Sequence, residues 1–363
     1  MTTTDVPPAG TADALAERLL AGVTATLELA AVHLGVELGW YRALADAPAT
    51  APELADRTGS DARYAREWLE QQAVAGVLVV DDARAAPDAR RYTLPTEYRG
   101  VLVDELDPSY MPPFARVALA FTRNVPRLTE VYRTGEGLSW ADMGPDAREA
   151  QGDANRPYFL GSLAEDLRSL PDVDAALRDG GRVADVGCGM GWSSVGIARA
   201  FPQVRVDGFD VDAPSVEQAG RNAEQAGVAD RVRFSTVDAA AVGERGNYDL
   251  VTAFECVHDL ADPVAVLAAM RAMARQGGTV LVVDENVAEE FTAPGDDIER
   301  LMYGYSLTCC LPDGRSTRPS AATGTVMRPA TLERYARDAG FAGIDVLPVE
   351  NDFFRFYRLR TEE

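Results

Sequence analysis

The chain has 363 residues, which exceeds one typical domain and leaves room for two hydrophobic cores. Its 35 basic and 57 acidic residues give a net charge of −22, so we expect no nucleic-acid partner and no attraction to anionic membranes. Every basic residue is arginine, and the lack of lysine excludes Schiff bases, pyridoxal phosphate attachment and the phosphate-binding lysine of a P-loop.

The cysteine pattern and the lack of an evident leader predict a soluble, cytoplasmic protein. Four cysteines, two of them adjacent, form no disulfide framework in a chain of this length. No signal peptide or long apolar run is expected. The first ten residues are polar, contain two prolines and predict a loose tail.

The N-terminal region predicts a long helix followed by a small winged-helix unit. Apolar residues recur at three- and four-residue intervals from Thr11 to Leu38, which indicates a helix with a wide apolar stripe. Thr50 and Glu53 form a capping box for a helix that ends at Gly59, and Asp61 begins the next helix. Two short apolar stretches, GVLVVDD and RRYTLP, then predict strands, so residues 50–96 are typical of a winged helix.

A winged helix can bind DNA or serve as a packing and dimerisation module. Residues 51–92 contain eight acids and six arginines, whereas a DNA-binding unit needs a basic surface. We therefore expect the second role. The apolar stripe from Leu15 to Leu34 is wider than one such unit needs to bury, which favours a homodimer. Residues 97–180 are expected to be mostly helical, to join the domains and to roof the site.

From Arg182 onward, apolar strands alternate with helical segments. This alternation predicts a parallel sheet covered by helices on both faces, a Rossmann-like domain. A glycine-rich loop, VGCGMGWSS, follows the first strand, and such loops let a ligand lie against main-chain N–H groups. The dinucleotide fingerprint requires a third glycine at position 192, where this chain has tryptophan, so NAD and FAD are not favoured.

The run from Asp185 through Gly187, Gly189 and Gly191 resembles the first motif of class I methyltransferases that use S-adenosylmethionine. The resemblance implies binding roles for several strand-end residues. Asp185 would meet the cationic methionyl end of the cofactor, and Asp210 would pair the two ribose hydroxyls. Val211 would flank the adenine, and Asp238 and Ala239 would meet its edge. Phe254, at the end of a later strand, is a further candidate for the cofactor site.

The domain order is similar to that of plant-type small-molecule O-methyltransferases and their bacterial and actinobacterial relatives. This resemblance implies an α/β fold with a mostly parallel seven-stranded sheet behind an α-helical winged-helix domain. Its expected parts are a dimerisation domain over 1–110, a helical linker over 111–172 and a catalytic domain over 173–363. His258-Asp259-x-x-Asp262 is similar to the family's H-D-W-S-D motif, with Leu and Ala in place of Trp and Ser.

The resemblance implies that His258 is the catalytic base, because an imidazole is suited to taking a hydroxyl proton. Asp259 accompanies it, and Asp284 falls near the acid that supports this histidine in the family, with Glu285 as the other possible partner. Asp262 and Pro263 fit a helix cap, and His33 is expected to be structural. We expect no metal, since only Asp259, Asp284 and Glu285 could serve a magnesium ion.

Residues 286–328 form an insertion that we expect to be a long loop lining a pocket. Its candidate substrate contacts are Met302, Tyr303, Tyr305 and Cys309. The favoured activity is O-methylation of a small, aromatic metabolite, and the alanine- and arginine-rich composition suggests natural-product biosynthesis. C- or N-methylation, a DNA-binding regulator, and an enzyme that uses the cofactor without methylating remain as alternatives.

Overall fold

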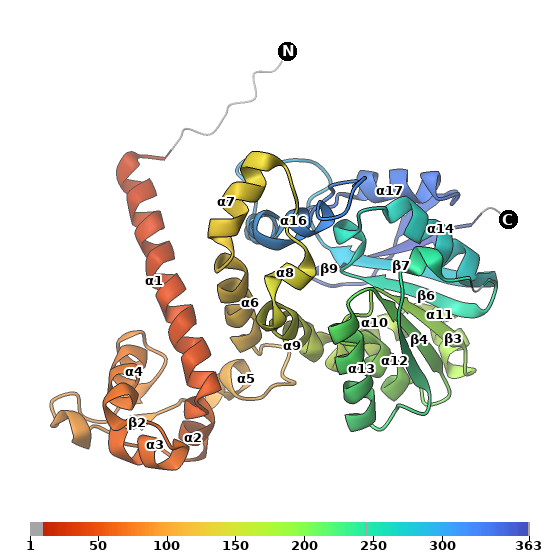
Figure 1. Cartoon of the computed structure of the whole chain (residues 1–363). Helices are drawn as coiled ribbons and strands as arrows, with labels where there is room; N and C mark the ends of the chain where they lie inside the picture. The colour runs from red at the N-terminus through yellow and green to blue at the C-terminus, as the bar shows by residue number, and fades with distance from the viewer. Residues whose placement is uncertain (1–9, 244, 362–363) are drawn as a thin grey trace. The chain divides into compact units, whose positions relative to one another are not determined.

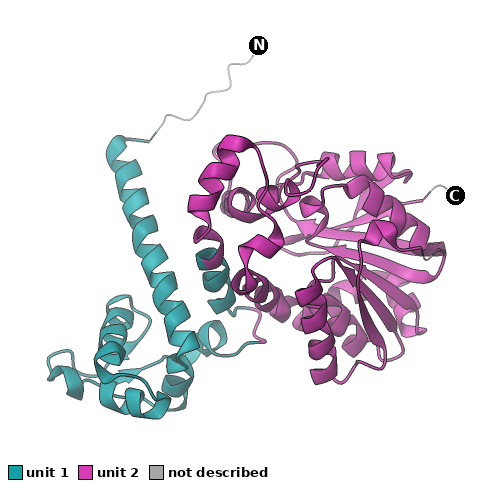
Figure 2. Ribbon diagram, viewed as in Figure 1, with its two compact units in different colours: residues 1–105, 109–119 teal, residues 106–108, 120–363 magenta. Residues whose placement is uncertain are grey.

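The computed structural model describes residues 10–243 and 245–361, so most of the expected N-terminal tail lies outside the described residues. The chain divides into two compact units (Figure 2). One comprises residues up to 105 together with 109–119, and the other comprises 106–108 and 120 onward. Each unit is described separately below.

The first unit contains the expected winged helix. The capping box at Thr50 and Glu53 is present, Gly59 ends its helix in the left-handed region with a φ of 67°, and Asp61 caps the next helix. The two predicted strands pair antiparallel, although each is only two residues long. The elements of this region are α1 Ala12–Glu37, α2 Trp40–Asp46, α3 Ala51–Thr58, α4 Ala62–Val74, β1 Val79–Val80, β2 Tyr92–Thr93 and α5 Arg99–Leu102.

Helix α1 joins the core of the first unit near its C-terminal end. Trp68 donates from Nε1 to the carbonyl of Ala31 at 2.8 Å, and Gly35 is buried so closely that a Cβ there would lie 2.4 Å from the Trp68 ring. Further toward the N-terminus, Leu20 and Leu27 are each 67% exposed. Among the described residues, α1 is also the one helix long and apolar enough to cross a membrane, so the expectation of no long apolar run was wrong.

The second unit is built on the predicted seven-stranded sheet, with strand order β5-β4-β3-β6-β7-β9-β8 (Figure 1). Strands β5, β4, β3, β6 and β7 are parallel, and β9 pairs antiparallel with both β7 and β8. The chain order reverses at β3, which lies between β4 and β6. Ligands of such sheets bind at this point, beyond the carboxyl ends of the strands. The strands are β3 Arg182–Val186, β4 Arg205–Asp210, β5 Val232–Thr236, β6 Tyr248–Phe254, β7 Ala274–Glu285, β8 Gly343–Val346 and β9 Phe354–Arg360.

Helices cover both faces of the sheet, and alternate strand residues supply a core on each side. Val183 and Leu250 pack in one cluster with side chains of α10 Leu163–Arg168, α11 Pro171–Arg178 and α12 Trp192–Ala200. Their neighbours Ala184 and Val251 pack in the other, with α14 Pro263–Met273 and α17 Pro329–Asp338. Helix α13 Ala213–Gln225 follows β4. The expected parallel sheet with two covered faces is confirmed.

Two helical segments outside the alternating core complete this region. Before the sheet lie α7 Val125–Thr134, α8 Trp140–Met143 and α9 Pro145–Gly161; α6 Pro112–Thr122 spans the boundary between the units, with residues 112–119 in the first. After β7, the middle of the expected long loop is helical: α15 Asp297–Tyr305 continues through a π-helix at Ser306–Cys310 into α16 Leu311–Gly314, while the residues on either side form loops. Asp296 caps α15 by accepting from the N–H of Glu299 at 2.8 Å. The glycine- and serine-rich stretch after this run made the whole insertion look irregular.

Candidate active site

The loop between β3 and α12 needs its glycines for conformation and for space. Gly187, Gly189 and Gly191 have φ values of 69°, 49° and 76°. Residues other than glycine rarely adopt this backbone conformation. A Cβ on Gly187 would lie 2.5 Å from Sγ of Cys256, and one on Gly191 would lie 2.6 Å from the Phe234 ring. A Cβ on Gly189 would meet nothing within 4 Å, so the backbone at this residue borders open space.

Asp185 lies beneath this loop and is only 1% exposed. Its Oδ2 accepts from the hydroxyls of Ser193 and Ser194 at 2.6 Å each, and its Oδ1 accepts from Thr252 at 3.0 Å. Burial raises the pKa of this carboxyl, while the three hydroxyl donors oppose the rise. These hydrogen bonds brace the start of α12, and the near-complete burial of Asp185 gives no support to direct contact with a ligand.

Asp210 joins the end of β4 to the glycine loop. It accepts from the N–H of Gly189 at Oδ2 and from the N–H of Asp212 at Oδ1, each at 2.8 Å. Val211 beside it is 71% exposed, as a residue available to a flat ligand should be. Sequence reasoning missed Arg148 of α9, whose guanidinium forms a two-bond ion pair with Asp212 while both side chains are nearly buried. Helix α9 is thus fastened to the loop that carries Asp210.

The remaining residues implied for the cofactor lie at the ends of β5 and β6. Asp238 is exposed and accepts from the N–H of Ala240 at 2.9 Å, so it caps the short helical turn Ala239–Ala241. Ala239 and Phe254 are buried. The Phe254 ring meets the Phe159 ring edge-on, with 5.5 Å between centroids, so the strand end packs against α9.

His258 lies just beyond β6 and is 2% exposed. Its Nδ1 is 2.8 Å from Oδ1 of Asp284 and 3.1 Å from Oε2 of Glu285, both at the end of β7. Its Nε2 is 3.3 Å from Oδ1 of Asp259. Burial alone would lower the pKa of His258, but the charges of the three acids outweigh burial and raise the pKa well above its usual value. The three acids therefore favour the protonated form of the imidazole.

A fourth acid, Glu255, belongs to the same cluster, and sequence reasoning missed it. Burial raises the pKa of Glu255 to about 8, with the charge of Glu285 as the next cause. Burial likewise raises the pKa of Glu285 to about 8. The sequence signal was present, since Glu255 directly follows an apolar strand and precedes the histidine by three residues. No motif pointed to it.

The candidate substrate residues separate into buried and exposed positions. Met302 and Cys309 are each 3% exposed, whereas Tyr303 is 39% exposed. Tyr305 is half-buried and meets the Phe121 ring edge-on at 6.0 Å, and burial raises the pKa of its hydroxyl to about 12. The neighbouring Cys310, not Cys309, lies close to the histidine, with its thiol within 4.8 Å of ligand atoms of His258 and Asp259.

The acids around His258 also form potential metal-binding groups. Within the described residues these are His258 with Asp259 and Cys310, and His258 with Asp284 and Glu285, each with ligand atoms within 4.8 Å of one another. In the second group, His258 lies 2.8 Å from Asp284 and 3.1 Å from Glu285, and direct hydrogen bonds and ion pairs also explain these contacts. The expectation that the site takes no metal stays a prediction.

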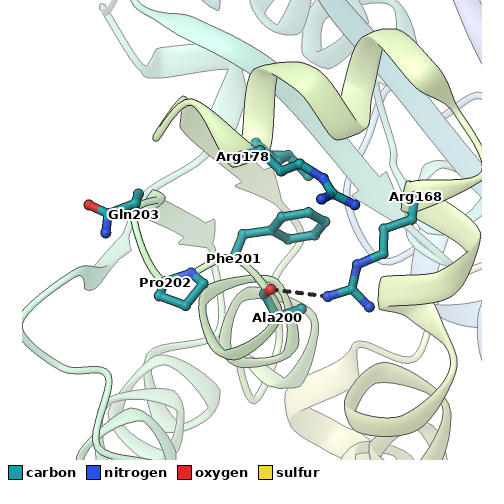
Figure 3. A pocket seen from close by; sticks show the side chains of 7 residues that line it. Arg168, Arg178, Ala200, Phe201, Pro202 and Gln203 are labelled. Carbon is teal, nitrogen blue, oxygen red and sulfur yellow. Dashed lines mark hydrogen bonds between the residues drawn. The ribbon is translucent and has the colours of Figure 1, made fainter.

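A separate hollow lies at the opposite, amino end of the sheet, where the chain enters β4. Its volume is about 370 Å³, and Arg168 donates to the Ala200 carbonyl across it at 3.2 Å (Figure 3). The Arg168 guanidinium also stacks over the Phe201 ring. None of the strand-end residues discussed above lines this hollow.

The glycine loop, the acid ending β4 and the buried histidine beyond β6 all lie at the carboxyl ends of parallel strands, around the point where strand order reverses. This arrangement, with two antiparallel strands at one edge, defines a class I methyltransferase core. Comparison with known proteins agrees. A model described as a methyltransferase domain matches residues 177–310, and one described as an Rv2258c-like winged HTH domain matches residues 26–103.

The ubiquinone biosynthesis O-methyltransferase of Bordetella bronchiseptica is 34% identical over 187 residues, which cover 52% of this chain and 69% of that protein. The solved structure of the mitomycin 7-O-methyltransferase MmcR has a TM-score of 0.71 at 23% identity, covering 97% of this chain and 99% of that one. Human N-acetylserotonin methyltransferase in complex with S-adenosylmethionine has a TM-score of 0.68 at 16% identity and covers both chains fully. The chain belongs to the S-adenosylmethionine-dependent methyltransferases, with S-adenosylmethionine as cofactor.

Proposed function

We propose that this enzyme methylates a hydroxyl oxygen of a small aromatic acceptor. The observation that carries the proposal is His258, buried beyond β6 and fixed by Asp284 next to the cofactor loop. O-methylation needs a group that receives the acceptor's proton, and the cluster around this histidine is rich in such groups. The names of the similar proteins, which include several O-methyltransferases, support the same reaction.

The residues present fit the cofactor. The backbone beside Gly189 borders open space, and Asp210 uses one lone pair of each oxygen on backbone N–H groups, which leaves acceptor capacity for two ribose hydroxyls. We assign Val211, Asp238 and Ala239 to the adenine. When bound, S-adenosylmethionine supplies an electrophilic methyl group, so the protein has mainly to align the acceptor and remove its proton.

His258 and its acids act as one proton-accepting unit in this proposal. The acids raise the pKa of His258 and favour its protonated form, so the imidazole does not accept a proton independently of them. Asp284 fixes the ring through Nδ1, and Asp259 lies on the Nε2 side. The proton of the acceptor therefore passes to the cluster as a whole and not to the imidazole alone. The reaction is faster at a pH at which the cluster has lost a proton.

Aromatic side chains support an aromatic acceptor. Phe121 meets both Trp140 and Tyr305 edge-on, with centroid separations of 6.5 and 6.0 Å, and Tyr305 leads into the π-helix that carries Cys310. We assign Tyr305 and Met302 to the acceptor pocket, with Cys309 behind them. Tyr303, the most exposed of the four candidates, is the weakest of these assignments.

We also propose a cytoplasmic homodimer without a nucleic-acid partner. The exposed leucines of α1 are the surface for a second copy of the chain. In the winged-helix unit, four arginines are already paired with acids, which leaves little free positive charge for phosphates. These pairs are Arg63–Glu67, Arg66–Asp88, Arg90–Glu70 and Arg91–Glu53.

Incubation of the protein with S-adenosylmethionine carrying an isotopically labelled methyl group and a panel of phenols, with products analysed by mass spectrometry, tests this function. We expect labelled aryl methyl ethers. Label found only on carbon or nitrogen would replace the proposal with C- or N-methylation, for which the same cofactor site serves. A sequence-specific DNA complex that survives physiological salt would instead favour the regulator.

A further inference from the structure

Glu255 has a backbone conformation that a glutamate rarely adopts. Its φ is 50°, in the left-handed region, and Ala322 is the other non-glycine residue with positive φ among the described residues. L-residues are disfavoured there because Cβ approaches the backbone carbonyl. Such strain is maintained only where the surroundings or a function demand it, and it is concentrated at ligand sites.

The carboxyl of Glu255 lies among three elements of the second unit. It extends from the end of β6, and Asn155 of α9 hydrogen-bonds its side chain. Its charge also acts on the hydroxyls of Tyr158 in α9 and Tyr305 at the start of the π-helix, raising the pKa of both. Glu255 thus faces the region that we assign to the acceptor, where α9, β6 and the insertion meet.

This region contains hydrogen-bond acceptors that have no donor. Oε1 of Glu255 is inaccessible and unpartnered, and so is Oδ2 of Asp284, a residue that is 1% exposed. Oε2 of Glu285 has only the ion pair with His258. Buried carboxyl oxygens are normally satisfied, so unpaired oxygens on neighbouring acids of one cluster can accept donors from a ligand. Above about pH 8, where Glu255 and Glu285 lose their protons, one imidazole against four acids leaves the cluster with excess negative charge.

We propose that Glu255 contacts the acceptor and selects it by charge, favouring an uncharged acceptor with two adjacent O–H or N–H donors and rejecting one with a carboxylate beside the reacting hydroxyl. This inference rests on the proposed O-methylation. One donor is the reacting hydroxyl itself, and the neighbouring donor satisfies another unpaired oxygen of the cluster. A carboxylate in that place would bring a further negative charge to acids that already repel one another.

The proton balance of the step follows from this contact. As the acceptor oxygen forms its bond to the methyl carbon, the bond from that carbon to sulfur breaks and its electron pair stays on sulfur. In the form of the enzyme in which Glu255 is ionised, the O–H proton passes to the carboxylate of Glu255, which shares it with Glu285. No further reactant is required, and the proton leaves to solvent after the product departs.

A purely structural role for Glu255 predicts different behaviour on substitution. If the side chain only supports the fold, its removal lowers Tm. If it is kept for the acceptor, Glu255→Gly relieves the left-handed strain and removes a buried acid, so Tm stays level or rises by a few degrees. Glu255→Gln keeps the shape of the side chain and removes its charge. Glu224→Gln, on the exposed surface of α13, is the matched control.

The experiment measures binding of catechol and salicylate to the protein loaded with S-adenosylhomocysteine, by titration calorimetry or ligand-observed NMR. At pH 8.5, above the pKa of about 8 of Glu255 and Glu285, we expect wild type and Glu224→Gln to bind catechol at least tenfold more tightly than salicylate, and Glu255→Gln to lose that preference by gaining salicylate affinity. Equal binding of the two probes by wild type, no catechol binding at millimolar concentration, an unchanged preference in Glu255→Gln, or a markedly lower Tm for Glu255→Gly would each overturn the inference. Failure of the loading step itself would instead refute the cofactor site, so the two failures are distinguishable.

Discussion

Nδ1 of His258 lies 2.8 Å from Oδ1 of Asp284, a contact that links the turn after β6 to the end of the adjacent strand β7. The two residues are 26 positions apart in the sequence, and each is at most 2% exposed. Parallel pairing of β6 with β7 brings them together, since the carboxyl ends of neighbouring strands meet at one edge of the sheet. The first prediction concerns this pair.

Substitution of His258 should separate binding from catalysis. His258→Ala removes the ring at the centre of the acid cluster but leaves the glycine loop and Asp210 intact, so affinity for S-adenosylhomocysteine should stay near wild type. Turnover should fall by about 10² to 10⁴, the usual effect of losing general acid–base chemistry. Calorimetry and steady-state kinetics measure the two quantities. His33→Ala, on the partly exposed surface of α1, should change neither. Full turnover in His258→Ala would show that alignment with the cofactor is sufficient.

Asp210 should control cofactor affinity. Asp210→Ala removes both the acceptor for the ribose hydroxyls and the two backbone contacts that fix the loop at Gly189 and Asp212. Hydrogen bonds to a charged group contribute about 1.5–3 kcal/mol, so affinity should weaken by roughly 10- to 150-fold. Calorimetric titration with S-adenosylhomocysteine checks this, with Asp230→Ala as a surface control. Unchanged affinity would mean that the ribose lies elsewhere.

The acid cluster should make the protein less stable in mildly alkaline solution. The pKa of Glu255 and that of Glu285 are raised from 4.5 to about 8 in the folded state, so the folded protein binds more protons than the unfolded chain between these values. The free energy of unfolding therefore falls as pH rises from about 4.5 to 8. His258, whose pKa is also raised, acts in the same direction above pH 6.5.

Thermal unfolding at pH 6.0 and pH 8.5 measures this effect. We expect Tm to be several degrees lower at the higher pH, and we expect Glu255→Gln to reduce the difference because one of the coupled acids is gone. Glu224→Gln should keep the full difference. A Tm that rises between these pH values in wild type would contradict the charge assignment of the cluster.

Much of the fold followed from local signals that do not depend on tertiary contacts. Three features could be predicted because each depends on a few neighbouring residues: the capping box at Thr50, the Asp262 cap with Pro263 and the apolar strands. The loop over 286–328 was misjudged because its helices are short and include a π-helix, whose spacing differs from 3.6 residues per turn. Local pattern cannot reveal such a segment.

The site was predictable where a motif marks it and not where distant segments meet. The carboxyl ends of adjacent strands could be inferred to meet, so His258, Asp210 and the acids ending β7 were all candidates. The close pairing of Arg148 with Asp212 joins residues 64 positions apart, and nothing in either segment indicates it. Likewise, the sequence places Asp185 at the loop but does not show that the hydroxyls of two serines and Thr252 donate hydrogen bonds to its carboxylate.

Helix α1 should mediate self-association. Leu20 and Leu27 are seven residues apart, lie on one face of the helix and are each 67% exposed, a large apolar surface for a chain in water. Burial of one such leucine contributes about 1.5–3 kcal/mol, so the double substitution Leu20→Asp with Leu27→Asp should weaken a dimer by several orders of magnitude while leaving the fold of each unit intact. Light scattering at micromolar concentration should show a dimer for wild type and a monomer for the variant. Glu28→Gln, on the same helix, should remain dimeric.

Because α1 is also apolar enough to cross a membrane, a vesicle flotation assay is the necessary companion measurement. Monomeric wild type that floats with vesicles would assign the leucine face to lipid, whereas a dimer that stays in solution would assign it to the second copy of the chain.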